Sequence, residues 1–218
     1  MKKDIMKYDQ NTVAEKVFDF VYDSALRDAV LQQAFKGEKH WISEVNEAKE
    51  LVRAYVDRLL NGGCDGEREH DAFFLKTANK ICIAVNGRKP ENVKDSFSFG
   101  NAQKLLNMSV KYLYILCYDK PEQRSCFAYC HCPLDSIMVN IVWKRYLEQK
   151  DKDKEARKKD LKPDFCSPWG CEGLNDEGKQ PELTAFPARY AAFQKAVKTL
   201  IGEGDVYPIE FDYLVWKQ

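Results

Sequence analysis

Apolar residues recur along this chain at the spacing of one helical face, and this periodicity constrains the fold more than any other feature. One stripe consists of Val13, Val17, Phe20, Val21, Ser24, Ala25 and Ala29, and another of Val45, Ala48, Leu51, Val52, Tyr55 and Leu59. The alternating pattern of a half-buried strand is scarce, and only short apolar pieces such as Ile81–Val85 are compatible with either a strand or a helix. The sequence therefore predicts an all-α fold.

Turn signals divide the rest of the chain into further helices. Asn61-Gly62-Gly63 ends the second helix. Later helices are predicted over Asp71–Val85, from Gly100 onward, over Pro133–Gln149 and over Ala188–Ile201, with a short apolar element over Pro208–Trp216. We expect a single two-lobed helical domain. Its sub-lobes would be residues 1–90 with 186–218, and 91–150, with a charged linker and irregular loop over 151–186.

The charge balance limits how this chain could bind nucleic acid. Its 218 residues carry 34 basic and 34 acidic side chains, a formal net charge of zero. Any contact with DNA would therefore need a local basic patch. The sequence has no signal-peptide pattern and no apolar run of membrane-spanning length. The protein is therefore expected to be cytoplasmic, with no membrane partner and reduced cysteines, while its oligomeric state does not follow from these features.

Lys104 and Asp135 stand out because each lies near the start of a predicted helix. Lys104 follows Gly100 by four residues, in a helix whose expected buried face is Ala102, Leu105, Leu106, Ser109, Leu113 and Leu116. Lys111 falls on the same side of that helix as Lys104. Asp135 follows Pro133, which suits a first helical position, so the aspartate is expected in a first turn where the helix dipole favours a carboxylate.

The stretch Gly100–Arg145 resembles the helix-hairpin-helix DNA glycosylases. The matching residues are Gly100, Lys104, the apolar run Leu105–Leu116 and Pro133-Leu134-Asp135. The long separation of Lys104 and Asp135 is similar to that of the archaeal 8-oxoguanine glycosylase branch, and so is the ending Phe211–Trp216. The usual Gly-x-Gly of the family hairpin has only Ser98-Phe99-Gly100 as a counterpart, and the tail lacks the iron–sulfur cysteines of some members.

The resemblance implies base excision and strand cleavage at the abasic site, on duplex DNA with an oxidised purine such as 8-oxoguanine. Lys104 would attack the sugar carbon and form a Schiff base, and Asp135 would stabilise the oxocarbenium-like centre. The backbone at Gly100 would bind phosphate, and Gln103 would bind a base or phosphate. Lys144 and Arg145 would bind phosphate, and Lys111, on the same side of the helix as Lys104, would also contact DNA. The aromatic side chains that could stack on a flipped base are Trp41, Phe97, Phe99, Trp169 and Phe186.

Other interpretations of the same residues stay open at this point. Taken singly, Lys104 and Lys111 suit solvated helix lysines, and Asp135 suits a helix cap. The same scaffold could serve as a non-catalytic module that binds nucleic acid or a protein. Cys130, Cys132, Cys166 and Cys171 could hold zinc, although buried thiols are the simpler interpretation. His131 could orient Asp135 or lie in the core.

Overall fold

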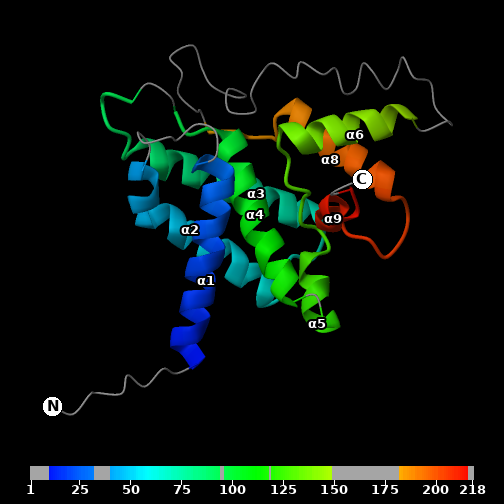
Figure 1. Cartoon of the computed structure of the whole chain (residues 1–218), viewed down its shortest axis with the longest axis horizontal. Helices are drawn as coiled ribbons and strands as arrows, with labels where there is room; N and C mark the ends of the chain where they lie inside the picture. Colours follow the sequence, from blue (N-terminus) through cyan, green and yellow to red (C-terminus); the bar gives the residue numbers. More distant parts are fainter. Residues whose placement is uncertain (1–9, 32–39, 94–95, 118, 149–181, 216–218) are drawn as a thin grey trace.

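The elements of this protein are helices, in the parts of the chain that the structure describes (Figure 1). The computed structural model describes residues 10–31, 40–93, 96–117, 119–148 and 182–215, and no strand occurs in these ranges. The all-α prediction is therefore confirmed, and Ile81–Val85 lies within helix α3. Most of the predicted linker and loop, up to residue 181, lies outside the described residues. No helix in the described ranges has the length and apolar character needed to cross a membrane.

Helices α2 (Asn46–Leu60) and α3 (Glu67–Asn86) pack as an antiparallel pair. Gly62 and Gly63 turn the chain between them with φ values of 134° and 67°, a backbone region that favours glycine. The predicted stripe of α2 is confirmed, because all its members are buried except Leu51, which packs at the margin of the core. Helix α3 begins before its predicted start at Asp71, which places His70 and Asp71 inside the helix.

The buried face of helix α1 (Gln10–Leu26) differs from the predicted stripe. The helix continues into a π-helical turn, η1 (Arg27–Leu31). Phe20 is 67 % exposed, whereas Phe18 is 6 % exposed and lies under the Arg53 guanidinium of α2, and Val21 and Ala25 are buried. The prediction was wrong at Phe20 and also at Val17, which is exposed. The two possible stripes share Val21 and have the same helical period, so periodicity alone does not choose between them.

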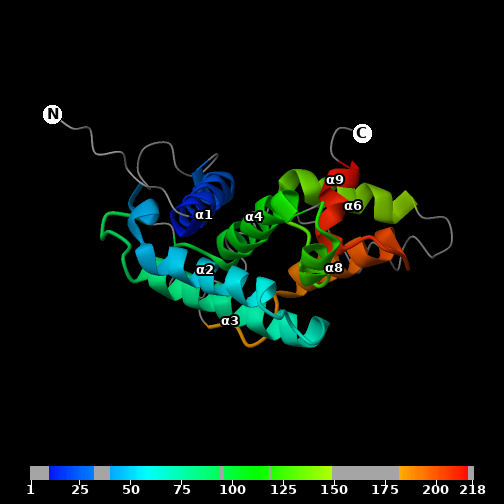
Figure 2. The same cartoon turned by 90° about the horizontal axis from the view of Figure 1, so that it is seen from below.

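Helix α4 (Phe99–Cys117) runs through the middle of the molecule, with α1, α2 and α3 on one side and α6, α8 and α9 on the other (Figure 2). It is buried on most of its surface and contacts α1, α2 and α3. The predicted buried face is confirmed except at Leu116, which is 50 % exposed in the last turn. A lysine on this helix is therefore surrounded by protein on most sides, which distinguishes it from a lysine on a surface helix.

The second half of the described chain forms further helical elements beside α4. They are α5 (Pro121–Arg124), η3 (Ser125–Phe127), α6 (Ser136–Glu148), α8 (Ala188–Ile201), η4 (Pro208–Glu210) and α9 (Phe211–Val215), while η2 (His40–Glu44) precedes α2. The predicted bounds of α8 are confirmed. Helices α6 and α8 pack side by side (Figure 1), and the division into sub-lobes stays a prediction.

Candidate functional site

The structure brings Lys104 and Asp135 together. The Lys104 Nζ atom lies 3.5 Å from the Asp135 Oδ2 atom, and the two side chains are 22 % and 34 % exposed. Lys104 stands in the second turn of α4, and Asp135 immediately precedes α6. The two residues that the sequence singled out therefore form a partly exposed ion pair between two helix starts.

Asp135 is the N-cap of α6. Its Oδ1 atom accepts a hydrogen bond from the Met138 N–H at 2.8 Å, and its carbonyl accepts one from the Val139 N–H at 2.8 Å. The helix consequently begins at Ser136, and the prediction that Pro133 opens it was wrong. The segment Cys130–Asp135, which forms no helix or turn, leads into the cap. Capping uses one carboxylate oxygen and leaves the other facing Lys104, at a helix end that favours negative charge.

The start of α4 is fixed by hydrogen bonds of the Ser98 side chain and backbone. The Ser98 hydroxyl donates to Asn101 Oδ1 at 2.9 Å, and the Ala102 N–H donates to the Ser98 carbonyl at 3.0 Å. Just before it, the Asn86 side-chain amide both donates to and accepts from the Phe97 backbone, each at 2.8 Å. These bonds tie the start of α4 to the end of α3, so Lys104 projects from an anchored helix end.

Gln103 connects the backbone on the two sides of the ion pair. Its side chain is fully buried, and its Nε2 atom donates to the Leu134 carbonyl at 2.8 Å and to the Gly100 carbonyl at 3.1 Å. Gly100 is buried as well. Neither residue presents an exposed surface to DNA in this structure. Gln103 holds the residue before Asp135 against the turn that carries Lys104.

A buried hydrogen-bonded chain continues from Gln103 into the protein. The Asn107 amide donates to Gln103 Oε1 and to the Tyr190 hydroxyl, both at 3.1 Å. The Tyr190 hydroxyl lies 2.8 Å from His131 Nδ1, and His131 Nε2 lies 3.0 Å from Asp71 Oδ1. His131 is thus a core histidine, and its hydrogen bonds lead through Tyr190, Asn107 and Gln103 to the carbonyl of Leu134, the residue before Asp135.

The buried hydrogen-bonded chain continues from Asp71 to a second buried histidine, His70. His70 Nδ1 lies 3.1 Å from Asp71 Oδ1, and His70 Nε2 lies 2.8 Å from the Tyr55 hydroxyl. Because a carboxylate only accepts hydrogen bonds, we assign the N–H groups to the two ring nitrogens that face Asp71. The other two ring nitrogens then accept from tyrosine hydroxyls. Every member of this chain is satisfied in that arrangement, as a buried polar network requires.

Burial and hydrogen bonding shift the ionisation of this network. Burial lowers the pKa of His131 to about 4, against the opposing effect of its hydrogen bond to Asp71. Burial alone would raise the pKa of Asp71, but hydrogen bonds from His131 and His70 hold it below its usual range. At neutral pH the network therefore contains a neutral His131 and an ionised Asp71.

Lys111 belongs to a second lysine–aspartate pair on α4. Its Nζ atom bonds Asp212 Oδ2 on α9, and the two side chains are 13 % and 5 % exposed. The Tyr213 hydroxyl donates to the Lys111 carbonyl at 3.0 Å. Asp212 Oδ1 is buried without a hydrogen-bond partner among the described residues. Lys111 is therefore largely buried in an ion pair of its own, rather than exposed as a phosphate contact.

The other predicted site residues lie apart from the ion pair or outside the described ranges. Lys144 is exposed and Arg145 partly buried on α6. Among the candidate stacking residues, Phe97 and Phe99 are buried, while Trp41 and Phe186 are partly buried against the core. Trp169 lies outside the described residues, as do Cys166 and Cys171. Cys130 and Cys132 are buried thiols, and nothing described brings them into a common ligand cluster.

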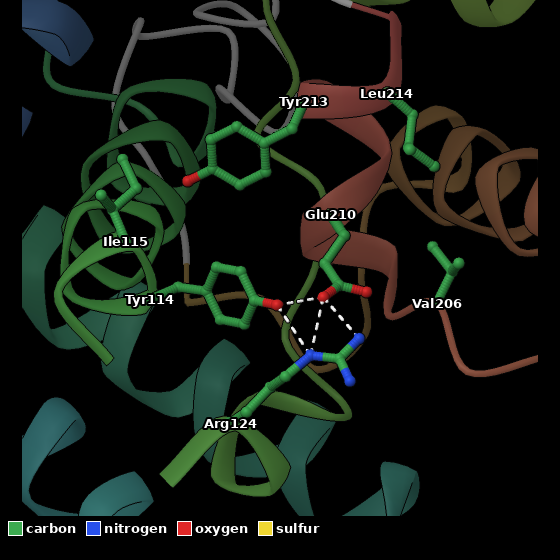
Figure 3. Close-up of a pocket in the computed structure, with 7 residues that line it drawn as sticks. All are labelled: Tyr114, Ile115, Arg124, Val206, Glu210, Tyr213 and Leu214. Atoms are coloured by element: carbon green, nitrogen blue, oxygen red, sulfur yellow. Dashed lines mark hydrogen bonds and ion pairs between the residues drawn. The ribbon is translucent and has the colours of Figure 1, made fainter. Parts of the chain in front are cut away.

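A pocket of about 600 Å³ opens beside the last turn of α4 (Figure 3). Glu210 accepts hydrogen bonds there from Arg124 Nη2 at 2.7 Å, from Arg124 Nε at 3.0 Å and from the Tyr114 hydroxyl. Ile115, Val206, Tyr213 and Leu214 complete the lining. Ile115 is eleven residues beyond Lys104, or about 16 Å along the helix axis at 1.5 Å per residue. The pocket is therefore a different part of the molecule from the Lys104–Asp135 pair.

Sequence reasoning missed most of the buried polar chain. Gln103 and Asn107 are polar residues four apart on a largely apolar helix, and that placement was a usable signal for a buried network. Tyr190 and His70 gave no such signal, because their partners are remote in sequence.

In comparisons with known proteins, no family model, curated protein or solved structure matches this chain. The functional argument therefore rests on its own residues.

Proposed function

We propose that this protein is a DNA base-excision glycosylase with associated lyase activity at the abasic site, acting on an oxidised purine such as 8-oxoguanine. The observation that carries the proposal is the contact of 3.5 Å between Lys104 Nζ and Asp135 Oδ2. The two groups come from remote segments, are partly exposed, and are positioned by helix-end interactions. Such a pair supplies both groups that the proposed reaction needs.

Each member of the pair has a defined chemical role. Departure of the base leaves positive charge on the sugar, and the Asp135 carboxylate stabilises that charge electrostatically. The Lys104 amine attacks the sugar carbon and forms a Schiff base, which commits the strand to cleavage. Because the Met138 N–H holds one Asp135 oxygen at 2.8 Å, the carboxylate is already oriented before the substrate binds. Orientation of this kind lowers the reorganisation required during the reaction.

The Lys111–Asp212 pair supports a purine with an extra N–H group as the substrate. Lys111 follows Lys104 by two helical turns and lies on the same side of α4. Asp212 Oδ1 is buried and lacks a donor among the described residues. 8-Oxoguanine carries an N7–H donor where guanine has an acceptor. The Asp212 side chain is 5 % exposed, so this oxygen would meet that donor, and favour the oxidised base, only after the side chains that cover it move aside. A buried acceptor left without its donor penalises the undamaged base.

The proposal is tested by trapping the Schiff base. The full chain is incubated with duplex DNA that contains 8-oxoguanine or an abasic site, and borohydride is then added. We expect a covalent protein–DNA adduct that disappears in Lys104→Gln. The control is Lys80→Gln, because Lys80 is an exposed lysine on α3 and should leave the adduct unchanged.

Two other outcomes would count against this function. An adduct that persists in Lys104→Gln would assign the nucleophile to another amine. Absence of an adduct on both substrates, with DNA binding intact, would support a non-catalytic nucleic-acid-binding module on this scaffold. Wild-type protein should excise 8-oxoguanine in preference to guanine. Loss of this preference in Asp212→Asn would support a role of the Asp212 carboxylate in recognising the damaged base.

A further inference from the structure

Three ligand-type atoms converge where the buried polar chain reaches α3. Asp71 Oδ1 lies 3.1 Å from His70 Nδ1 and 3.0 Å from His131 Nε2, and the three atoms lie within 4.8 Å of one another. We propose that His70, Asp71 and His131 form a binding site for a divalent transition-metal ion such as Zn²⁺. The proposed function involves no metal, and the inference does not depend on it.

The spacing of these atoms suits a common metal ion. Zn²⁺ binds imidazole nitrogen and carboxylate oxygen at about 2.0–2.2 Å, which places neighbouring ligand atoms roughly 3–4 Å apart. The two contacts of Asp71 Oδ1 already fall in that range. An ion between the three atoms would replace the two hydrogen bonds, and the two histidine nitrogens lie within 4.8 Å of each other. Two imidazoles and one carboxylate are also a ligand set typical of Zn²⁺, Fe²⁺ and related ions.

Burial places the ligands at different depths. The His70 and His131 side chains are 1 % and 2 % exposed, whereas that of Asp71 is 29 % exposed. Adjacent residues of α3 supply His70 and Asp71, and His131 comes from the segment before α6. The carboxylate thus forms the solvent side of the cluster and gives an ion a route of entry. Three protein ligands leave a further coordination position for water or a small ligand.

The surroundings also provide the outer hydrogen bonds that metal-bound histidines use. A histidine bound through one nitrogen donates its other N–H to a nearby acceptor. Here the outer nitrogens are His70 Nε2 and His131 Nδ1, each 2.8 Å from a hydroxyl, those of Tyr55 and Tyr190. A tyrosine hydroxyl accepts as readily as it donates, so both tyrosines can serve as these acceptors.

The Tyr55 hydroxyl has a second partner that can take its hydrogen when it accepts from His70. It also contacts the Cys130 thiol, whose sulfur is a weak hydrogen-bond acceptor. Rotation of the Tyr55 hydroxyl hydrogen therefore converts this side of the network from hydrogen-bonded to metal-bound. On the other side, the Tyr190 hydroxyl already accepts from the Asn107 amide and would accept from His131 as well.

The test uses Co²⁺ as a spectroscopic probe on the full chain after removal of metal by a chelator. We expect one equivalent of Co²⁺ to bind with the weak visible bands of nitrogen and oxygen ligands, and Zn²⁺ to displace it. The eight cysteines of the chain are the main competitors. Thiolate ligands would add an intense near-ultraviolet charge-transfer band, so the spectrum identifies the type of site.

Substitutions assign the ligands. Loss of a residue that only hydrogen-bonds a metal ligand typically weakens metal binding about 10–100-fold. Asp71 and His131 would be ligands themselves, so Asp71→Asn and His131→Gln should each weaken Zn²⁺ affinity at least about 100-fold. The matched control is His40→Gln, because His40 is the third histidine of the chain and begins η2. This variant should bind Zn²⁺ as the wild type does. Circular dichroism establishes that each variant is folded.

Wild-type protein supplies a readout that needs no variant. In nitrogen-15 spectra of the histidine rings, Zn²⁺ should shift Nδ1 of one histidine and Nε2 of another, with His40 unaffected. Bound metal should also raise the Tm, because an ion that binds only the folded state stabilises it. A thiolate-type spectrum, binding that survives Asp71→Asn, or no binding at micromolar metal would each overturn the proposal.

Discussion

Gln103 acts on the candidate site through backbone contacts. It directly precedes Lys104, and its amide reaches the carbonyl of Leu134, which directly precedes Asp135, at 2.8 Å. A buried amide that satisfies two carbonyls cannot shift without leaving them unpaired, at a cost of about 1–3 kcal/mol for each. The separation of Lys104 and Asp135 is therefore held by a neighbour of each residue.

Asp135 combines a structural role with the proposed chemical role, and two substitutions separate them. Asparagine caps helices about as well as aspartate, whereas alanine costs about 1 kcal/mol at this position. We expect Asp135→Asn to keep wild-type stability and Asp135→Ala to lose that amount in urea unfolding. Both should reduce adduct formation with duplex DNA that contains 8-oxoguanine by about 10²–10³-fold, the usual effect of removing one electrostatic group. Full activity in Asp135→Asn would contradict the proposed chemical role of the carboxylate, whereas its role as a helix cap would stand.

Cys82 provides a pH-dependent test of burial. Burial raises the pKa of its thiol from 9.0 to about 12. Between these values the unfolded chain loses the proton first, so stability should fall as pH rises, by about 1.4 kcal/mol per pH unit from this group. Urea unfolding from pH 7 to 10.5 under reducing conditions should show a shallower decline for Cys82→Ala than for wild type. The control is Cys126→Ala, at a partly exposed thiol; parallel curves for Cys82→Ala and wild type would exclude the effect.

At the level of single helices, the sequence predicted what depends on local signals. The bounds of α8 and the buried face of α2 follow from periodicity and from flanking proline and glycine, and the structure confirms them. The start of α6 was misplaced because Pro133 is favourable at a first helical position, whereas Asp135 Oδ1 bonds the Met138 N–H and caps the helix two residues later. The phase of α1 was misjudged because two overlapping stripes satisfied the same period.

The phase of α1 can be measured with two substitutions of the same type. Phe18 is 6 % and Phe20 67 % exposed. Phe18→Ala should lower the free energy of unfolding by about 3 kcal/mol because it removes a buried ring. Phe20→Ala should change it by no more than about 0.5 kcal/mol. The reverse order in urea denaturation would mean that α1 presents its other face to the core.

At the scale of the whole molecule, the candidate site depends on contacts that local patterns do not encode. Lys104 and Asp135 were paired in advance only through a family resemblance, since periodicity places each of them on its own helix. The Tyr190–His131 and Lys111–Asp212 contacts join residues far apart in sequence. Local patterns carry no information on which remote segments meet, so the buried network and the proposed metal ligands required the structure.

One such long-range contact attaches the C-terminal elements to α5. Arg124 Nη2 lies 2.7 Å from Glu210 Oε1, and the two side chains are 31 % and 10 % exposed. Glu210 Oε2 also accepts the Tyr207 N–H at 2.7 Å. Removing one partner leaves the other charge largely buried and unpaired, which costs up to about 3–5 kcal/mol in fully buried pairs. Because Arg124 is partly exposed, we expect a smaller loss, about 2 kcal/mol, for Arg124→Met.

A double-mutant cycle isolates this contact. Arg124→Met combined with Glu210→Gln should cost less than the sum of the single substitutions, with a coupling energy of about 1–2 kcal/mol in urea unfolding. Hydrogen exchange should accelerate over residues 206–215 in each single variant, while α2 and α3 keep their protection, because the pair's hydrogen bonds go to Tyr114, Asp205 and Tyr207. Strictly additive costs would mean that the ion pair does not hold these elements. Uniform loss of protection would mean that they unfold together with the rest of the chain.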